Sequence, residues 1–229
     1  MPVTVHGVSA SNADLTAIER WRRIPVAVAV DVSHGACQID PRIRPLCPAG
    51  RQPRLFGRAV TALCMPPDFG AVLHALDLVK PSDVLVIAAN GHGETAMIGE
   101  ILGGHLRRLG AGGLVCDGAI RDVAELAGWV DLPVFARAIT PRGPTSADKG
   151  EVNCAVVVGG RLITPGDLII GDDDGLAALS PAEIDAYIRD AEAKLDREAQ
   201  WQASLAGGRS IAETFGLAVP HPGVQKSVP

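Results

Sequence analysis

The feature of this sequence that most constrains its fold is the segment from Gly99 to Asp122, which reads GEILGGHLRRLGAGGLVCDGAIRD. Its first half carries apolar residues at helical spacing and ends in a glycine-rich turn. The run GGLVCD then has the character of a short buried strand, and an Asp-Gly pair is expected to turn the chain after it. A helix that leads through a tight turn into a buried strand is a unit of a layered α/β fold.

Apolar patterning predicts helices and strands in mixed order before this segment. They are a helix over 12–23, a buried strand over 25–32, a strand over 57–65, a helix over 68–79 and a strand over 84–89. The last of these, VLVIAA, is a continuous apolar run that is typical of a strand covered on both faces. It is expected to end at Asn90-Gly91-His92-Gly93.

Strands predominate after the segment. The patterns predict a short helix over 123–127, a strand over 132–139, a loop over 140–150, strands over 152–158, 161–163 and 168–170, and a turn over 171–175. Two capping boxes follow, at Ser180 to Glu183 and at Ser210 to Glu213. The first is expected to open a helix that runs to about residue 205, the second a short terminal helix, and the chain from 220 onward reads as a tail.

Mixed elements followed by a group of strands predict an α/β layered sandwich rather than a regular doubly wound sheet. The length of 229 residues fits a single domain over 1–229, with a core at about 25–179 and a helical extension at about 181–216.

Composition narrows the classes of function. The formal net charge is −5 at pH 7 and no basic stretch is interleaved with aromatic residues, which argues against a nucleic-acid partner. No apolar run is long enough to cross a membrane, and the first residues lack a secretion-signal pattern, so we expect a cytoplasmic location. The five scattered cysteines predict reduced thiols, with Cys116 and Cys154 as small buried apolar residues.

Several polar motifs carry weak signals. The glycines around His92 and at 110–113 lack the spacing or the following helix of a phosphate loop, so tight turns are preferred. The histidines form no zinc-type pair, and His92 is interpreted as a polar loop residue, with a role in a site left open. The run Asp172-Asp173-Asp174-Gly175 lacks further acidic ligands at calcium-loop spacing, so a turn capped by aspartates is preferred to a metal site.

Arg121 and Asp122 form the strongest candidate site. A cation beside a carboxylate, just past a strand, can hold an anionic substrate and a hard metal ion together. Glu100 begins the preceding helix and is a second candidate oxygen ligand, and the amides of a helix start bind carboxylates. A surface ion pair between Arg121 and Asp122 is the equally weighted alternative.

The segment at 99–122, together with LPVFARAITPRGPT and VVVGGRLITPGDLIIGDDDG, resembles the RraA-like superfamily over about 57–205. The likeness is strongest at the patterns DGxxRD, which bears on the site, and PGDxxxGDxDG, which bears on the fold. The superfamily includes class II, metal-dependent 4-hydroxy-4-methyl-2-oxoglutarate / 4-carboxy-4-hydroxy-2-oxoadipate aldolases. The resemblance implies a layered α-β-β-α sandwich of the RraA-like, swivelling-domain-like type.

The resemblance also implies residue roles. Arg121 would hold the pyruvate moiety and stabilise its developing enolate, and Asp122 would ligate Mg²⁺ or Mn²⁺ directly. Glu100, where the family commonly has aspartate, would orient waters on that metal. The implied substrate-binding segment is Gly99, Glu100, Ile101 and Leu102, with the amides of the last two receiving the pyruvate carboxylate.

The family further brings a C-terminal glutamate of a neighbouring subunit to the metal-bound waters, and Glu198 is the candidate here. Ile184, Ala191, Glu198 and Leu205 recur at seven-residue intervals, so Glu198 lies along an otherwise apolar helix face. It lies either at the edge of that face or in an intersubunit site. The implied assembly is a homo-oligomer, trimer or hexamer, with an active site between subunits.

The implied reaction cleaves a 4-hydroxy-2-oxo acid to pyruvate and a second oxo acid, with oxaloacetate decarboxylation as a side activity. No lysine lies within 99–122, which disfavours a Schiff base there. Two alternatives remain: a non-catalytic RraA-type regulator of an RNA-degrading endonuclease, and a related lyase on another oxo or hydroxy acid, with the loop at 31–54 setting the pocket. Because such regulators are typically shorter, the C-terminal extension favours the aldolase.

Overall fold

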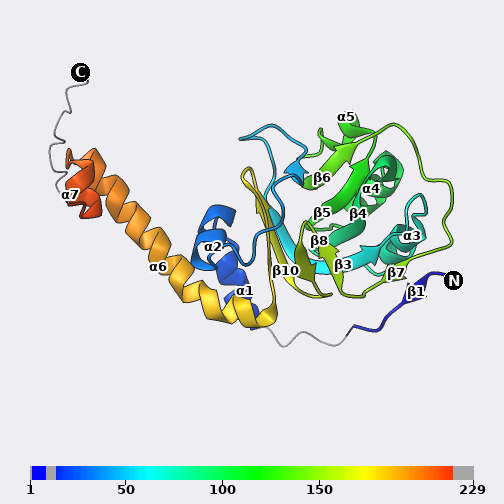
Figure 1. The fold of residues 1–229 in the computed structure, drawn as a ribbon, viewed down its shortest axis with the longest axis horizontal. Coiled ribbons are helices and arrows are strands. Elements are labelled where there is room, and N and C mark those ends of the chain that lie inside the picture. The colour runs from blue at the N-terminus through cyan, green and yellow to red at the C-terminus, as the bar shows by residue number, and fades with distance from the viewer. Residues whose placement is uncertain (1, 9–13, 219–229) are drawn as a thin grey trace, which may run out of the picture.

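Four adjacent parallel strands form the centre of the fold (Figure 1). In this computed structural model, which describes residues 2–8 and 14–218, they are β3 (Leu55–Leu63), β4 (Val84–Ile98), β5 (Gly113–Ile120) and β6 (Val134–Ile139). The sheet continues through β7 (Glu151–Val152) and β1 (Thr4–Val5) beyond β3, and through β2 (Arg44–Pro45) beyond β6. Parallel order with helical crossovers is the arrangement that the mixed pattern predicted.

Strand β3 belongs to two sheet regions at once. Its first half pairs antiparallel with β10 (Leu168–Asp172), which pairs with β11 (Gly175–Leu179), whereas its second half pairs with β4 and β7. The hairpin of β8 (Val156–Val158) and β9 (Arg161–Ile163) lies on the same side as β10 and β11.

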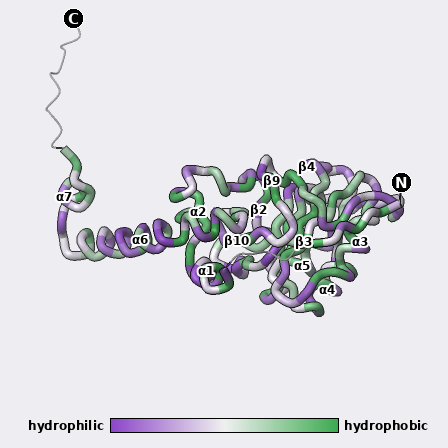
Figure 2. The backbone as a smooth tube through the Cα atoms, turned by 90° about the horizontal axis from the view of Figure 1, so that it is seen from below, coloured by the Kyte–Doolittle hydropathy of each residue, from purple (hydrophilic) through white to green (hydrophobic). Residues whose placement is uncertain are grey.

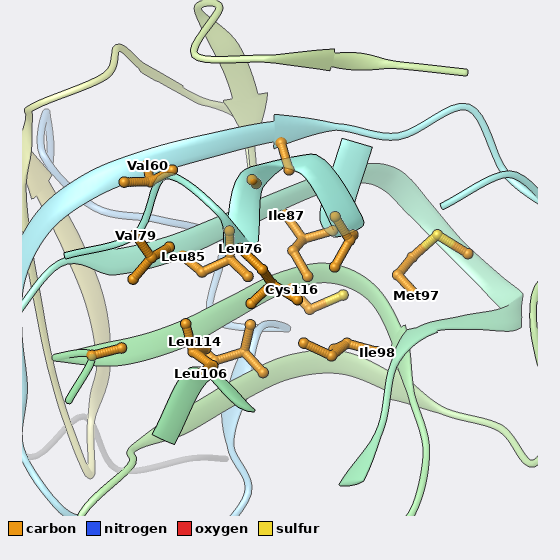
Figure 3. Packing of buried hydrophobic residues seen from close by; sticks show 14 of the residues in the cluster. Val60, Leu76, Val79, Leu85, Ile87, Met97, Ile98, Leu106, Leu114 and Cys116 are labelled. Carbon is orange, nitrogen blue, oxygen red and sulfur yellow. The ribbon is translucent and has the colours of Figure 1, made fainter. Parts of the chain in front are cut away.

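Three buried clusters separate four layers. The first packs α3 (Gly70–Leu76), α4 (Glu100–Arg108) and α5 (Val123–Leu126) on one face of the parallel strands, and Figure 3 shows part of it. The second fills the space between the other face and β8 to β11. The third packs α1 (Leu15–Trp21), α2 (Val26–Val32) and α6 (Pro181–Ala206) on β10 and β11. The layers therefore run α-β-β-α, and the predicted sandwich is confirmed.

The expected strand over 25–32 is wrong, because this segment is helix α2. Its alternating valines and alanines favour a strand, but tertiary contacts override that preference. The carboxylate of Asp172, 146 residues away, accepts the Val26 N–H at 2.8 Å and so caps the first turn. Val26 and Ala29, one turn apart, are buried in the cluster that α2 shares with α6.

Two strands continue past the turns that the glycines predicted. β4 runs to Ile98 through an irregular stretch in which Asn90 and Gly91 have positive φ, so Asn90-Gly91-His92-Gly93 bulges the strand without ending it. β5 runs to Ile120, because Asp117 is paired with Arg137 and accepts the Gly159 N–H at 2.8 Å, which satisfies its carboxylate inside the fold.

The strand group near the carboxyl end differs in detail from the prediction. The expected strand over 152–158 is two short strands, β7 and β8, separated where Asn153 takes a left-handed conformation at φ 57°. The expected turn over 171–175 is shorter, and β11 follows it where no strand was predicted. The other predicted elements are present with shifts of a few residues at their ends.

Both predicted capping boxes are present. Ser180 caps α6 and Ser210 caps α7 (Ile211–Phe215), each with a glutamate at the third helical position that bonds back. At 26 residues, α6 is about 39 Å long. Its first half packs on the body and its second half projects from it, with hydrophilic and hydrophobic residues alternating along it (Figures 1 and 2). The predicted tail from residue 220 onward lies outside the described residues.

Candidate functional site

The candidate site lies where β4 and β5 end at one edge of the parallel sheet. Gly99 joins β4 to α4, and Arg121 and Asp122 join β5 to α5. Because β4 and β5 are parallel neighbours, two segments that lie 22 residues apart in sequence meet in space. The carboxyl ends of parallel strands are the usual place for ligand sites in α/β folds.

Asp122 binds the start of α4 directly. Its Oδ2 accepts the N–H of Glu100 at 3.0 Å, which supplies a carboxylate to one of the free amides of the helix N-terminus. The next two amides, of Ile101 and Leu102, meet no hydrogen-bond acceptor among the described residues. Two N–H donors therefore remain at the positive end of the helix dipole and can receive an anion.

Asp122 itself is held in an unusual backbone conformation. It takes φ 57° and ψ 38°, in the left-handed region, and acts as the N-cap residue of α5. A non-glycine residue there carries strain of order 1 kcal/mol or more, which the surrounding contacts must offset. The strained conformation places the carboxylate beside α4.

Gly99 is required by close approach at this corner. A Cβ added to it would lie 2.4 Å from Asp122 Oδ2 and 2.8 Å from Arg121 Cγ. Both distances are shorter than any that real Cβ atoms show. The absence of a side chain at position 99 is therefore what lets both charged residues lie against the turn into α4.

Arg121 lies in the site without being fixed to Asp122. Its Nε is 3.5 Å from Asp122 Oδ2, a distance that suits an ion pair but exceeds that of an N–H···O hydrogen bond. The two side chains are 40% and 41% exposed, so the pair itself contributes little stability. The guanidinium lies close against Gly143, where an added Cβ would be 2.7 Å from Nη1.

A cavity of about 210 Å³ opens beside Arg121. Its wall is built from the end of β4, the first turn of α4, helix α3 and the loop after β6, and Arg121 is its one charged residue. Sequence reasoning did not find the contributions of Phe69, Leu73 and Pro144. Pro144 lies in the run LPVFARAITPRGPT, but nothing in the sequence marks any of the three as part of a cavity wall, so only the tertiary fold reveals them.

Asp68 fixes the loop that closes one side of this cavity. It is buried, and it accepts hydrogen bonds from the N–H groups of Gly70, Asp148 and Lys149 at 2.9–3.0 Å. Burial favours the neutral carboxyl, but hydrogen bonds from Ser146 and from these three amides outweigh it and lower the pKa of Asp68. Asp68 thus links α3 to the loop that carries Pro144.

The donor set at Asp122 fits a hydrated hard cation. Within the described part of the chain, no three His, Cys, Asp or Glu side chains converge on one point, so a closed cage of side chains is absent. Mg²⁺ commonly keeps several waters and binds through only one or two carboxylates. Asp122 offers one half-exposed carboxylate whose Oδ1 accepts no hydrogen bond from the described residues, and Glu100 presents a second, exposed one at the neighbouring turn.

Glu198 does not reach the site at Asp122 of its own chain, and its predicted role concerns the site of a neighbouring subunit. Glu198 lies in the second half of α6 and pairs with Lys194 at 3.1 Å. That half of the helix projects from the body on the side away from α4 (Figures 1 and 2). Ile184 and Ala191 of the same seven-residue series are buried, whereas Glu198 is half-buried.

The remaining candidates have structural partners. His92 shares a hydrogen bond of 2.7 Å with Thr95 inside the irregular part of β4. In the aspartate run, Asp172 accepts the Val26 and Asp174 amides and Asp173 accepts the Gly50 amide, as expected of a capped turn. All five cysteines are free; Cys116 is buried, and burial raises the pKa of its thiol well above the ordinary value.

Comparisons with known proteins place this geometry in a family. The family model "RraA-like: Aldolase/RraA" matches residues 26–177. A protein of Halalkalibacterium halodurans named "Putative 4-hydroxy-4-methyl-2-oxoglutarate aldolase" is 32% identical over 194 residues, which cover 84% of this chain and 90% of that protein.

No helix among the described residues is both long and apolar enough to span a membrane.

Solved structures agree in fold. Streptomyces coelicolor RraAS2, described as an unusual member of the RNase ES inhibitor RraA protein family, superposes with a TM-score of 0.71 at 26% identity, over 86% of this chain and all of that one. An uncharacterised protein from Pseudomonas syringae gives 0.78 at 20% identity, over 90% of this chain and all of its own, which speaks for the fold alone. The chain belongs to the RraA-like family, which comprises aldolases and RraA proteins.

Proposed function

We propose that this chain is a divalent-metal-dependent carbon–carbon lyase that releases pyruvate from 4-hydroxy-2-oxo acids and decarboxylates oxaloacetate. The observation that carries the proposal is the corner at Gly99. Arg121 and the two residues with free helix amides line a cavity there, and the Asp122 carboxylate binds the same helix start. These groups match the adjacent carboxylate and keto oxygen of a 2-oxo acid.

Binding and orientation fall to the helix start and to Arg121. The amides of Ile101 and Leu102 receive the substrate carboxylate, and the Arg121 guanidinium donates to the keto oxygen. Mg²⁺ or Mn²⁺, held by Asp122 with Glu100 orienting its waters, supplies Lewis-acid polarisation of the 2-oxo group when bound. No lysine lines the cavity in the described structure, in agreement with a reaction that needs no Schiff base.

The bond changes follow from that placement. Loss of the 4-hydroxyl proton lets C4–O become a carbonyl while the C3–C4 bond breaks, and its electron pair stays with C3 as the enolate of pyruvate. Arg121 stabilises the negative charge that grows on the enolate oxygen, an effect that is strong because it is preorganised. Protonation at C3 gives pyruvate. Oxaloacetate bound in the same way loses CO₂ from C3 and leaves the same enolate.

We further propose that the site is completed between subunits of a homo-oligomer, trimer or hexamer, with Glu198 of a neighbouring subunit near the metal-bound waters. The support is the helix itself: the half of α6 that carries Glu198 leaves its own body, so another protomer can be met by it. Mixing Glu198→Ala and Arg121→Ala proteins under conditions of demonstrated subunit exchange should restore activity through sites that have both residues. No recovery would refute this role.

The experiment that tests the activity is a coupled lactate dehydrogenase assay across a panel of 4-hydroxy-2-oxo acids and oxaloacetate, with 4-hydroxy-4-methyl-2-oxoglutarate included because the relative from H. halodurans bears its name. We expect pyruvate release with Mg²⁺ or Mn²⁺ that EDTA and Asp122→Ala abolish. Release without metal, or from none of these acids, would overturn the proposal.

A non-catalytic regulator of an RNA-degrading endonuclease is the second candidate, favoured by the likeness to the Streptomyces protein over 86% of the chain. It predicts inhibition of such a nuclease at stoichiometric concentrations and no change in that inhibition by Arg121→Ala. Pyruvate release that depends on Arg121 would decide for the lyase.

A further inference from the structure

Apart from Arg121 and the free backbone amides at the start of α4, the cavity beside Arg121 is walled by apolar groups. Of the ten residues that line it, nine have no polar side chain, and Arg121 at its edge is the tenth. Met97 and Ile98, at the end of β4, are buried and lie at one end of the cluster in Figure 3. Leu73 lies in α3, Phe69 is the N-cap residue of that helix, and Pro144 comes from the loop that Asp68 fixes.

The size of this cavity suits a group of several carbon atoms. An apolar cavity of about 150 Å³ lined by Leu, Ile and Phe side chains stays dry and holds a benzene ring. The cavity here measures about 210 Å³ and has walls of the same kind. An apolar substituent gains free energy there by leaving water, whereas a carboxylate loses its hydration without gaining a partner.

Cations on α4 do not alter this conclusion. Arg107 and Arg108 line a separate depression on the other side of Ile101. The Arg108 guanidinium lies back against Gly104, where an added Cβ would be 3.6 Å from its Nη1. Arg107 is also paired with Asp131 at 2.6 Å. Neither arginine lines the cavity beside Arg121.

We propose that the 4-hydroxy-2-oxo acid cleaved at this site carries an uncharged, apolar group on C4, and that this group occupies the cavity formed by Phe69, Leu73, Met97 and Pro144. The proposal rests on the proposed function. The products are pyruvate and an apolar aldehyde or ketone: the C3–C4 bond breaks, the 4-hydroxyl loses its proton, and C3 gains one. Arg121 serves the 2-oxo end, and no other charged residue of the described chain lines the cavity.

The first test compares two substrates that differ in one group. 4-Hydroxy-4-methyl-2-oxopentanoate has a methyl where 4-hydroxy-4-methyl-2-oxoglutarate has a carboxylate, and both release pyruvate on cleavage. With the full-length, Mg²⁺-loaded protein, kcat/KM for the methyl compound is expected to exceed that for the dicarboxylate by at least about tenfold, the scale on which apolar pockets discriminate. Equal values, or a preference for the dicarboxylate, would overturn the proposal.

The second test places a cation in the wall. Leu73→Arg should shift the ratio of the two kcat/KM values toward the dicarboxylate by about tenfold or more. Val130→Arg adds the same charge at a position that is 82% exposed and does not line the cavity, so it should leave the ratio unchanged. The ratio is measured within one preparation and is independent of the folded fraction. An unchanged ratio in Leu73→Arg would refute the proposal.

A binding measurement keeps the test valid even where Leu73→Arg does not fold. 2-Oxopentanoate and 2-oxoglutarate lack the 4-hydroxyl and differ in a terminal methyl against a carboxylate. Calorimetric titration of the wild-type protein should give tighter binding of 2-oxopentanoate, and tighter binding of 2-oxoglutarate would count against the proposal.

Oxaloacetate decarboxylation distinguishes a failure of the proposed lyase activity from a failure of the apolar assignment, because oxaloacetate carries no substituent on C4. Decarboxylation together with a preference for the dicarboxylate would refute the apolar assignment alone. Loss of decarboxylation and of all cleavage would refute the proposed function, and the assignment with it.

Discussion

Replacing Gly99 with alanine should inactivate the site while leaving the fold in place. The new Cβ would lie 2.4 Å from Asp122 Oδ2, whereas ordinary van der Waals contact begins at 3.4 Å, so the carboxylate must move by about 1 Å. A displacement of about 1 Å at a reacting centre costs about 10²-fold in rate. Arg121 is displaced as well, because its Cγ would lie 2.8 Å from the same Cβ.

The cost in stability is expected to be small and calculable. Moving Asp122 weakens its hydrogen bond to the Glu100 N–H, and loss of such a cap destabilises a helix by about 1 kcal/mol. For a chain of this size that corresponds to a fall in Tm of about 2–4 °C. A hundredfold loss of activity with so small a change in Tm separates a local displacement from unfolding.

Gly104→Ala is the matched control, on the same helix and with the same chemical change. An added Cβ there meets nothing closer than 3.6 Å, at Arg108 Nη1. Alanine in place of an interior helical glycine stabilises by roughly 0.5–1 kcal/mol, so Tm should rise while activity stays at the wild-type level. Pyruvate release by the coupled assay and circular dichroism melts measure both quantities. Wild-type kcat/KM in Gly99→Ala would refute the account of this corner.

Further predictions concern the charges and the metal. Arg121→Lys should lower kcat/KM for pyruvate release by about 10²-fold, because an ammonium cannot reproduce the forked donor; steady-state kinetics with near wild-type values would contradict this. Removal of divalent ions with EDTA should abolish turnover and Mg²⁺ should restore it, as followed in the coupled assay; persistence of activity in stripped protein would contradict it. Asp68→Asn should destabilise the fold by about 1–3 kcal/mol at pH 7. Because the folded pKa of Asp68 lies below its ordinary value of 3.8, its contribution is present above that pH and fades as pH falls below it, so urea unfolding should show wild type and variant converging in acid. A difference that grows in acid would exclude this origin.

A layered α/β sandwich was predictable because it follows from local patterns, whereas the α-β-β-α order was implied by the family resemblance. The continuous apolar run in β4 and the grouped strands near the carboxyl end are sequence patterns that predict a layered sandwich. Both capping boxes act through residues three positions apart, so the starts of α6 and α7 were also readable. Local signals of this kind need no knowledge of the rest of the chain.

The errors arose where distant residues decide local structure. The segment of α2 is capped by Asp172 and buried against α6, and neither contact is visible in VAVAVDV. In β5, Asp117-Gly118 looks like a turn until Arg137 is known to satisfy the aspartate. A buried carboxylate inside a strand is costly unless a partner is present, and sequence alone does not reveal that partner.

For the site, sequence indicated the charged groups but not their surroundings. Arg121 and Asp122 stood out as a pair beside a turn, and the structure supplies the reason that Gly99 precedes α4. The apolar wall formed by Phe69, Leu73 and Pro144 was not predicted, because nothing in the sequence shows that these residues face one cavity. Glu198 remains a prediction, because its role depends on a second copy of the chain.

The most direct measurement is exchange of the methyl protons of pyruvate with deuterium, followed by proton NMR in D₂O. The exchange tests for the enolate itself, which we propose forms at Arg121 beside the Asp122 carboxylate. It does not depend on which 4-hydroxy-2-oxo acid is cleaved. We expect wild-type protein with Mg²⁺ to speed the exchange, and EDTA, Arg121→Ala and Asp122→Ala to abolish that effect. Exchange no faster than in protein-free buffer, or unaffected by Asp122→Ala, would contradict the central claim.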